Sequence, residues 1–474
     1  MKLKNGIIFQ IIIITVLLLL LSYTFYRSEV FYKGELREYY NYIYIILIIT
    51  LFFSIIFNFL NYKIKQYIKI FFFSGLFSLY LFEWYCTAFI PITNLGIETL
   101  ILKKKIRLYK KNENKNYDAR SEYDAYLDFK KKYKKIVPTM GAVVNLSNND
   151  ILPLGGISNS KTFHCNENGY YSKYESDRFG FNNPDVEWDK EKIEYLLIGD
   201  SFIHGACVNR PYDISSVLRR ISGKTVINLG YGGNGPLIEY ASLREYLKPN
   251  TKNVVWFFYE GNDLKNLHKE ITSEILNKYL ENLNYLKNLI LKQIKINYLL
   301  QSIIENKINS LKSSKDLIEE KKNYEKKIKR SQFIKLFRTR ELLKEIIKKK
   351  PILKNNPKSF EHWDTNKKVM DVFIKILKET NNLVQKNESN FYFVYLPSNR
   401  RYFDHTFTDN LRVKIKKITS ELGITFIDIH EEIFKKKKNP KKYFPFELSG
   451  HYNKLAYSKI SKEIYLQINN KKNE

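Results

Sequence analysis

Three polar residues in this chain of 474 residues are placed to carry out nucleophilic chemistry on a carbonyl group. Ser201 follows the apolar run Tyr195–Ile198 and a Gly199-Asp200 turn, and a helical pattern begins directly after it. A hydroxyl at that position suits a nucleophile, because the N–H groups and the dipole of a helix N-terminus favour developing negative charge. Asn262 follows the next strongly apolar segment, and His451 lies 250 residues after Ser201. This order predicts a serine nucleophile served by a histidine.

The segments around these residues indicate a parallel sheet. Strands are expected at Ile193–Ile198, Thr225–Leu229, Asn253–Tyr259, Phe391–Leu396 and Thr425–Ile429. Helical patterns separate most of them, and apolar strands that alternate with helices are typical of a parallel sheet covered on both faces. The predicted fold class is therefore α/β with three layers.

Residues 192–268 and 391–460 resemble the SGNH family of GDSL-type serine esterases and acyltransferases. The family is named for four sequence blocks that carry its Ser, Gly, Asn and His. The blocks in this chain are Gly199-Asp200-Ser201, Asn228-Leu229-Gly230-Tyr231-Gly232-Gly233-Asn234-Gly235, Glu260-Gly261-Asn262-Asp263 and Phe446-Glu447-Leu448-Ser449-Gly450-His451-Tyr452-Asn453. The resemblance implies the flavodoxin-like parallel sheet of the SGNH hydrolase fold.

The resemblance also implies a role for each of the four residues. Ser201 would attack an ester carbonyl, and His451 would take its proton and return it to the leaving group. Gly233 best matches the family glycine, with Gly232 as a near alternative. The N–H groups of Ser201 and Gly233 and the side chain of Asn262 would form the oxyanion hole, where one donor is typically worth about 3 kcal/mol in the transition state.

The acid that should orient His451 is the point where the chain departs from the family pattern. The family has Asp three, or sometimes two, residues before the histidine, and these positions hold Leu448 and Ser449. Glu447 is one residue further back, and we expect it to orient His451 through a longer reach. Asp428 at the end of the preceding strand, or a Ser-His dyad without an acid, are the alternatives.

We expect four parts along the chain. They are a membrane anchor of three transmembrane helices at 1–93, a helical stalk at 94–136, short strands and loops at 137–190, and an SGNH-like catalytic domain at 191–474. A Lys-rich helical insertion at about 266–362 interrupts the catalytic domain. This insertion could be a helical cap over the active site or a solvated decoration of the domain, and the sequence does not distinguish the two.

Three apolar stretches, at about 7–26, 43–60 and 70–90, approach the roughly 20 residues that span a bilayer. Lys2 and Lys4 precede the first stretch, and the second loop carries three lysines and no acidic residue (Lys63, Lys65 and Lys69). The positive-inside rule then puts the N-terminus in the cytoplasm and everything after about residue 93 outside it, at the plasma or inner membrane. Glu83 is expected near the outer interface.

The composition leaves several points open. A net charge of +30 fits either a drift in composition or attraction to anionic lipids and glycans, and nucleic acid is not expected as a partner of a membrane-tethered chain. Cys165 and Cys207 either pair outside the cytoplasm or remain buried thiols. No metal or organic cofactor is implied, because the ligand spacings are absent.

The function expected from these features is an extracytoplasmic serine esterase that removes acyl groups, acetyl foremost, from an envelope glycan or lipid. One alternative is an O-acyltransferase that modifies an exported polysaccharide by the same Ser-His chemistry and needs a partner protein as acyl donor. The other is a catalytically silent SGNH-like glycan-binding protein, which the missing Asp would favour.

Overall fold

The structure is a computed structural model that describes residues 2–89, 94–133, 135–142, 151–347, 365–404 and 407–470. The described residues fall into two compact units. One, the anchor unit, lies within residues 1–92 and 328–353. The other, the sheet unit, lies within residues 93–327 and 354–474.

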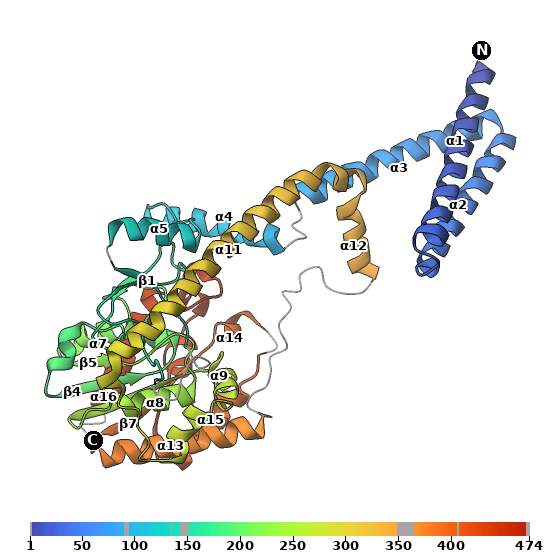
Figure 1. The fold of residues 1–474 in the computed structure, drawn as a ribbon. Helices are drawn as coiled ribbons and strands as arrows, with labels where there is room; N and C mark the ends of the chain where they lie inside the picture. Colours follow the sequence, from blue (N-terminus) through green and yellow to red (C-terminus); the bar gives the residue numbers. More distant parts are fainter. Residues whose placement is uncertain are drawn as a thin grey trace. The chain divides into compact units, whose positions relative to one another are not determined.

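The sheet unit is built on five parallel strands (Figure 1). They are β4 (Ile193–Ile198), β5 (Val226–Asn228), β6 (Thr251–Tyr259), β7 (Asn390–Leu396) and β8 (Thr425–Asp428). Their spatial order is β5-β4-β6-β7-β8, which is the flavodoxin-like order 2-1-3-4-5. The predicted parallel α/β sheet is confirmed, with each strand within two residues of its expected bounds.

Alternation along the strands explains why helices cover both faces of this sheet. Leu196 and Ile198 of β4 point into one core, and Tyr195 and Leu197 point into the other. The first core also takes apolar residues from α8 (Pro236–Tyr246), α13 (Lys367–Lys386) and α15 (Asn410–Glu421). The second takes them from α7 (Ile214–Ser222) and α16 (Lys454–Asn470). The result is the expected three-layer arrangement.

A small second sheet precedes the large one in the chain. Strand β1 (Ile136–Pro138) pairs in parallel with β2 (Lys161–Phe163), and β2 pairs antiparallel with β3 (Lys173–Glu175). Helices α4 (Asn94–Glu113) and α5 (Glu122–Lys132) come before it, and the 3-10 helix η4 (Asp185–Asp189) follows it. The loop that joins β2 to β3, residues 164–172, carries one of the groups of the active site.

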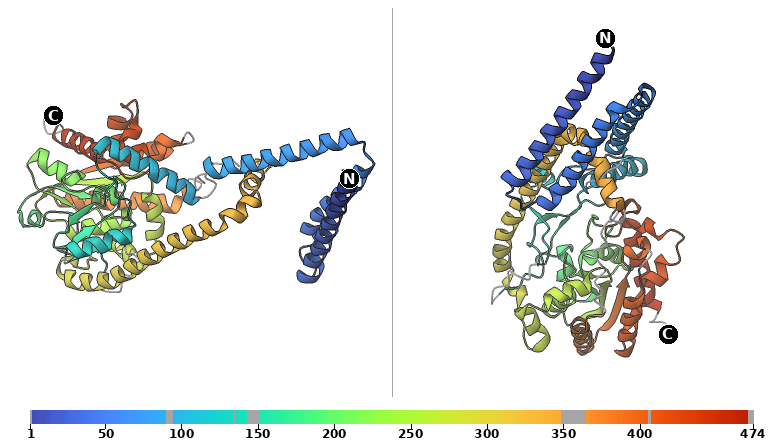
Figure 2. Two further views of the ribbon diagram at one scale, coloured as in Figure 1. Left: turned by 90° about the horizontal axis from the view of Figure 1, so that it is seen from above. Right: turned by 90° about the vertical axis from the view of Figure 1, so that its right-hand side faces the viewer.

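The anchor unit contains the three expected apolar helices. They are α1 (Lys2–Phe25), continued by the π-helix η1 (Tyr26–Phe31), α2 (Arg37–Ile56) with the 3-10 turn η2 (Phe57–Phe59), and α3 (Tyr62–Phe89), drawn in blue in Figure 2. All three are long and apolar enough to cross a membrane. Their large apolar side chains are exposed along most of their length, as lipid-facing side chains would be.

The helical insertion between β6 and β7 contributes to both units. It begins with α9 (Asp263–Glu270), α10 (Glu274–Glu281) and the 3-10 helix η5 (Leu289–Lys292), and α11 (Gln293–Ile334) comes next. Ile296, Leu300 and Ile304 of α11 are buried in the first core of the sheet unit, so this part is not a solvated decoration. The last helix of the insertion, α12 (Phe337–Ile347), belongs to the anchor unit and packs against α3.

Glu83 of α3 explains how α12 is held in the anchor unit. Its carboxylate is fully buried and accepts hydrogen bonds from Arg338 N at 2.9 Å, Thr339 N at 2.7 Å and Thr339 Oγ1 at 2.8 Å. The two backbone groups are among the unpaired donors of a helix N-terminus. Glu83 therefore caps a helix that begins about 255 residues later in the chain. The sequence around Glu83 does not indicate this contact.

Candidate active site

Ser201 begins a helix of four residues, α6 (Ser201–His204), directly beyond the carboxyl end of β4. Gly199 has φ +157°, and a Cβ there would lie 2.7 Å from Ile203 Cγ1, so this turn favours glycine. Asp200 caps the helix, because its Oδ1 accepts the N–H of Phe202 at 2.8 Å. The Gly-Asp-Ser block is thus a tight strand-to-helix turn that presents the hydroxyl of Ser201.

His451 and Glu167 complete a relay that starts at Ser201. His451 Nε2 lies 2.9 Å from Ser201 Oγ, and His451 Nδ1 lies 3.0 Å from Glu167 Oε1. The other oxygen, Glu167 Oε2, accepts the backbone N–H of His451 at 2.6 Å. A carboxylate on Nδ1 keeps the proton there and leaves Nε2 free to accept the proton of Ser201, which is the arrangement of a Ser-His-acid triad.

Gly450 makes room for this carboxylate. Its φ is +155°, and a Cβ at this position would lie 2.6 Å from Glu167 Oε2. The residue before His451 must therefore lack a side chain, because the acid approaches His451 across the place that a Cβ would occupy.

Burial and charge act in opposite directions on this relay. Burial lowers the pKa of His451, but the hydrogen bond and the charge of Glu167, aided by Asp200, outweigh it and leave the pKa raised above 6.5. Burial raises the pKa of Glu167, and the contacts with His451 more than offset this, so its pKa is lowered. The pair is held as a carboxylate facing an imidazole that readily takes up a proton.

The two acids considered in the sequence do not contact His451. Glu447 has φ +57° and is exposed, and its Oε2 accepts a hydrogen bond from Asn439 Nδ2 at 3.4 Å. Asp428 Oδ2 accepts Arg412 Nη1 at 2.7 Å, and Asp428 Oδ1 accepts two backbone N–H groups that come after it in the chain. The expectation that Glu447 orients His451 is therefore corrected: Glu167 lies against His451, while a sharp turn directs Glu447 elsewhere.

No signal in the sequence connects Glu167 with His451. The two residues are 284 positions apart, and Glu167 lies in an Asn166-Glu167-Asn168-Gly169 run that indicates only a turn. The loop between β2 and β3 brings it to His451. The single clue is the neighbouring Cys165, whose pairing with Cys207 the sequence leaves open.

The residues expected in the oxyanion hole lie at the carboxyl ends of adjacent strands. Ser201 follows β4, Gly233 follows β5 and Asn262 follows β6. Gly233 has φ +84° and is exposed, which favours glycine at this turn. Within the described residues, the side chain of Asn262 has no hydrogen-bond partner, and its Oδ1 is buried. Its amide N–H groups are therefore available to a substrate.

Hydrogen bonds hold the Gly233 turn and the helix after Asn262 together. Asn266 Nδ2 of α9 donates to Asn234 O at 3.0 Å. Glu270, also of α9, accepts Gly235 N at 2.6 Å and Leu237 N at 3.0 Å. The turn that contains Gly233 and the helix that follows Asn262 are therefore held to each other at the edge of the sheet where Ser201 lies.

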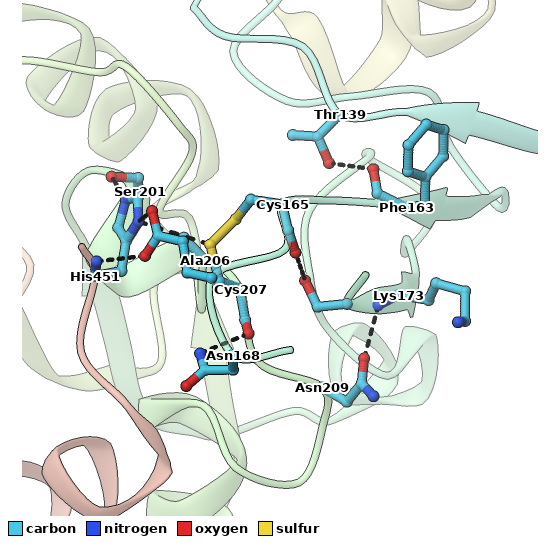
Figure 3. The surroundings of a disulfide bond; sticks show 12 residues. Thr139, Phe163, Cys165, Asn168, Lys173, Ser201, Ala206, Cys207, Asn209 and His451 are labelled. Carbon is cyan, nitrogen blue, oxygen red and sulfur yellow. Dashed lines mark hydrogen bonds and ion pairs between the residues drawn. A yellow bond between two sulfur atoms is a disulfide. The ribbon is translucent and has the colours of Figure 1, made fainter. Parts of the chain in front are cut away.

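A disulfide between Cys165 and Cys207 lies directly beside the relay, as Figure 3 shows with Ser201 and His451. The Sγ atom of Cys207 is 3.8 Å from His451 Nδ1. The ligand atoms of Cys165, Cys207 and His451 lie within 4.8 Å of one another, but a disulfide offers no thiolate to a metal ion.

His204, one turn after Ser201, has an interior role. Its Nε2 is 2.8 Å from the hydroxyl of Tyr174, and its ring stacks on Tyr231. Burial lowers the pKa of His204 to about 3, so its imidazole is neutral. It supports the loop behind Ser201, and His451 alone lies at the hydroxyl of Ser201 among the described histidines.

No protein-family model matches this chain, and no curated protein matches it in sequence. The chain is similar in structure to a putative lipolytic protein of the G-D-S-L family from Desulfitobacterium hafniense DCB-2, with 12% identity and a TM-score of 0.30 over 58% of this chain and 98% of that chain. It is also similar to the acetyl xylan esterase AlAXEase, with 12% identity and a TM-score of 0.32 over 58% of this chain and 100% of that chain. We therefore base the function on the site itself.

Proposed function

We propose that this protein is a membrane-anchored serine esterase of the SGNH type that removes acyl groups, acetyl foremost, from a glycan or lipid outside the cytoplasm. The relay from Glu167 through His451 to Ser201 carries the proposal, with hydrogen-bond distances of 3.0 and 2.9 Å. A serine hydroxyl hydrogen-bonded to an imidazole that a carboxylate orients is the general signature of an activated nucleophile.

Each residue has one task in the proposed reaction. Ser201 Oγ attacks the ester carbonyl while His451 Nε2 accepts the hydroxyl proton, and Glu167 stabilises the imidazolium that forms. The N–H groups of Ser201 and Gly233 and the amide of Asn262 receive the oxyanion. His451 then protonates the leaving alcohol. In the second half of the reaction, His451 takes a proton from water, the water oxygen attacks the acyl group, and His451 returns the proton to Ser201 Oγ as the acid leaves.

A pocket beside the relay supports a carbohydrate as the part of the substrate that is held. It has a volume of about 260 Å³ and adjoins the loops of Glu167 and His451. Its lining combines aromatic rings with amide and charged groups, namely Tyr109, Tyr170 and Phe446 with Asn112, Asn168 and Lys454. Aromatic faces with a few polar groups around them suit a ligand that is apolar on its faces and polar at its rim.

The disulfide and the loop charges support an extracytoplasmic position for the sheet unit. Disulfides persist in oxidising compartments, and Cys165 and Cys207 lie in the sheet unit. The lysines in the first turns of α3 favour the cytoplasmic side for the connection between α2 and α3, and three crossings then export the part of the chain after α3.

The test is the reaction of the full-length protein in detergent with a fluorophosphonate probe, followed by intact-mass analysis. We expect one adduct on the parent protein, none on Ser201→Ala and slower labelling of His451→Ala. Hydrolysis of acetylated oligosaccharides would then define the substrate, and added acceptor sugar would reveal the acyltransferase as transfer above hydrolysis. A folded parent protein without an adduct would favour the silent binding protein, or an enzyme that only a membrane partner completes.

A further inference from the structure

Glu167 lies at the tip of a hairpin loop and is held there by bonds to two other segments. On one side, Asn166 Nδ2 donates to Asp118 O at 2.6 Å. On the other, Cys165 is bonded to Cys207, which follows Ser201 by six residues, and Asn168 Nδ2 donates to Cys207 O at 3.0 Å. The covalent bond therefore joins the acid's loop to the loop of the nucleophile.

The disulfide also touches the histidine at the atom that the acid holds. Cys207 Sγ lies 3.8 Å from His451 Nδ1, and Glu167 Oε1 lies 3.0 Å from the same nitrogen. The sulfur and the carboxylate thus both lie near Nδ1. Reduction of the disulfide therefore changes the surroundings of the nitrogen whose hydrogen bond sets the tautomer of His451.

We propose that the Cys165–Cys207 disulfide is a positioning element of the catalytic relay, which holds Glu167 on His451 and makes the activity of the enzyme depend on the oxidised pair. This inference rests on the proposed esterase function, because it concerns the same relay. It assigns to the two cysteines a role beyond the stability of the fold.

Reduction would disconnect the relay in two ways. A dithiol reductant gives two electrons and two protons to the disulfide, so that two thiols form and the reductant closes its own disulfide. The two sulfurs then no longer share a bond and must move apart, which displaces either the loop of Glu167 or the ring of His451. In addition, the new thiol of Cys207 is a weak donor beside Nδ1. If it donates to Nδ1, the ring proton moves to Nε2, which then cannot accept the proton of Ser201.

The remaining bonds of the hairpin make this effect local. Lys173 N donates to Asn209 Oδ1 at 2.7 Å, and Arg210 Nη2 donates to Glu175 O at 2.9 Å. Both bonds hold β3, and the amide bonds of Asn166 and Asn168 also remain, so the effect of reduction is confined to the short stretch around Glu167. We therefore expect the hairpin to stay docked after reduction while the carboxylate loses its place.

The pH dependence distinguishes a positioning role from a structural one. The titratable groups that face His451 are Glu167 from the hairpin loop, Asp200 from the turn after β4, and His164 and His204, whose pKa values burial lowers, so that both are neutral. Of these groups, His164 and Glu167 lie in the loop that the disulfide holds, and because His164 is neutral, only Glu167 changes the charge at His451 when that loop moves. Its loss lowers the pKa of His451, so the acid limb of the rate profile moves to lower pH as kcat falls.

The experiment compares four forms of the full-length protein in detergent, all in a Cys86→Ala background that removes the third thiol. The forms are the parent, Cys165→Ala/Cys207→Ala, Glu167→Gln, and the combination of all three substitutions. We expect the cysteine variant and Glu167→Gln each to lose about 100-fold or more in kcat with little change in KM. Their combination should lose no more than Glu167→Gln alone, and both should shift the acid limb downward.

Two outcomes would overturn the proposal. One is a cysteine variant that keeps kcat and the acid limb of the parent. The other is a loss that multiplies with that of Glu167→Gln and accompanies a lower melting temperature, because this would mean that the disulfide only stabilises the fold.

Reversible reduction covers the case in which the cysteine variant does not fold. Treatment of the folded parent protein with dithiothreitol should remove the activity, and a disulfide oxidant should restore it, while the circular dichroism spectrum stays constant. Cys165→Ala, which leaves a thiol beside Nδ1, should lose more activity than Cys207→Ala, which leaves none there. Full activity of the reduced, folded protein would overturn the proposal.

A measurement of the pKa of His451 without substrate distinguishes failure of this inference from failure of the proposed function. The pKa of His451 can be followed by NMR of histidine-labelled protein without any substrate. If the parent is not labelled by the fluorophosphonate probe, the esterase function fails. If opening the disulfide leaves the pKa of His451 in place, the positioning role fails whatever the activity.

Discussion

Glu167 contacts His451 with both carboxylate oxygens, so it determines more than the tautomer of the ring. Oε1 faces Nδ1 at 3.0 Å, and Oε2 accepts the backbone N–H at 2.6 Å. The second bond fixes the backbone from which the imidazole projects, and this limits the rotation of the ring away from Ser201. In the SGNH family, which the sequence resembles, an Asp stands two or three residues before the histidine, whereas the acid that contacts His451 here lies 284 positions away in the sequence.

Glu167→Gln should lower kcat by a factor of about 10² to 10⁴, because the imidazolium loses its counter-charge and Nδ1 its acceptor. The acid limb of the rate profile should move to lower pH, since burial alone lowers the pKa of His451 once Glu167 no longer raises it. The base works when neutral, so a lower pKa extends activity into acid while the maximal rate falls. Steady-state kinetics from mildly acidic to mildly alkaline pH provide the measurement.

Glu447→Gln is the matched control for that substitution. Glu447 has the sequence position nearest to that of the family acid, but its side chain is exposed and contacts Asn439. Its kcat and pH profile should stay within about twofold of the parent. If Glu447→Gln were the more damaging of the two substitutions, the assignment of Glu167 would be wrong.

Gly450→Ala should act through Glu167. The added Cβ would lie 2.6 Å from Glu167 Oε2, so the carboxylate must move away from His451. We expect kcat to fall toward that of Glu167→Gln, and the two substitutions together should cost little more than one. Gly223→Ala is the control, because Gly223 also has a positive φ but has open space at its Cβ. It should lower the melting temperature and spare kcat, and equal kcat losses in both variants would contradict the argument.

The predictable part of the site was the part encoded locally. Ser201 and Asn262 follow apolar strands within short blocks, and the turn before His451 has its own motif, so each could be found from its neighbours in the sequence. Glu167 could not be found this way, because its position depends on how a hairpin loop docks on a residue 284 positions away. Contacts of that kind depend on tertiary structure, and sequence spacing carries no information about them.

At the scale of elements, Glu270 links two helices at the edge of the site and should make stability depend on pH. Burial raises its pKa to about 7, although its carboxylate accepts backbone N–H groups of the α8 N-terminus. Between pH 4.5 and 7 the folded protein keeps a proton that the unfolded chain releases, so stability falls as the pH rises through this range. A shift of this size corresponds to about 3 kcal/mol.

Glu270→Gln should therefore flatten the dependence of the melting temperature on pH across the mildly acidic to neutral range. Glu274→Gln, at an exposed position of the neighbouring helix α10, is the control and should keep the slope of the parent. Asp200, whose pKa burial raises to about 6, contributes a slope of the same sign in all three proteins. An unchanged slope in Glu270→Gln would show that folding does not raise the pKa of Glu270.

The strands were predictable because each combines an apolar run with a turn at its carboxyl end. The helical insertion could also be predicted, but the surfaces on which it packs could not, because nothing in its Lys-rich helical pattern identifies a partner. Its beginning packs into the first core of the sheet unit through residues such as Leu300, while α12 packs on α3 in the anchor unit. Glu83 is expected from the sequence only near the outer interface, and the acceptor that it provides for α12 appears only in the structure.

Glu83→Ala should release α12 from α3. It removes the acceptor of Arg338 N, Thr339 N and the Thr339 hydroxyl. The loss is about 2 kcal/mol for a buried helix cap. Cleavage by trypsin at Arg338 and Arg340 should accelerate by about 30-fold if it depends on the opening of α12. Glu83→Gln keeps one acceptor oxygen and should lie between the parent and the alanine variant. Equal cleavage of all three proteins would argue against the cap.

At the scale of the whole molecule, charge and covalent chemistry both support the extracytoplasmic side that we propose for the sheet unit. The connection between α1 and α2 carries acids as well as basic residues, such as Glu29 paired with Arg37, whereas the connection between α2 and α3 and the first turns of α3 carry lysines and no acid (Lys63, Lys65 and Lys69). The positive-inside rule then retains this second connection in the cytoplasm. Disulfides persist in oxidising compartments, so the disulfide beside His451 supports the export of the same chain segment that three crossings would carry outside.

A reporter that is active only after export should therefore be active when fused after residue 474 and inactive when fused between α2 and α3, near residue 61. When cells are lysed directly into denaturant that contains a maleimide, the reagent should label one cysteine, Cys86, because Cys165 and Cys207 are joined. Reduction before labelling should raise the number of labelled cysteines to three.

The reverse reporter pattern, with all cysteines labelled without reduction, would place the relay in a reducing compartment. Glu167 would then lack its covalent support, and the proposed esterase would have to work without it.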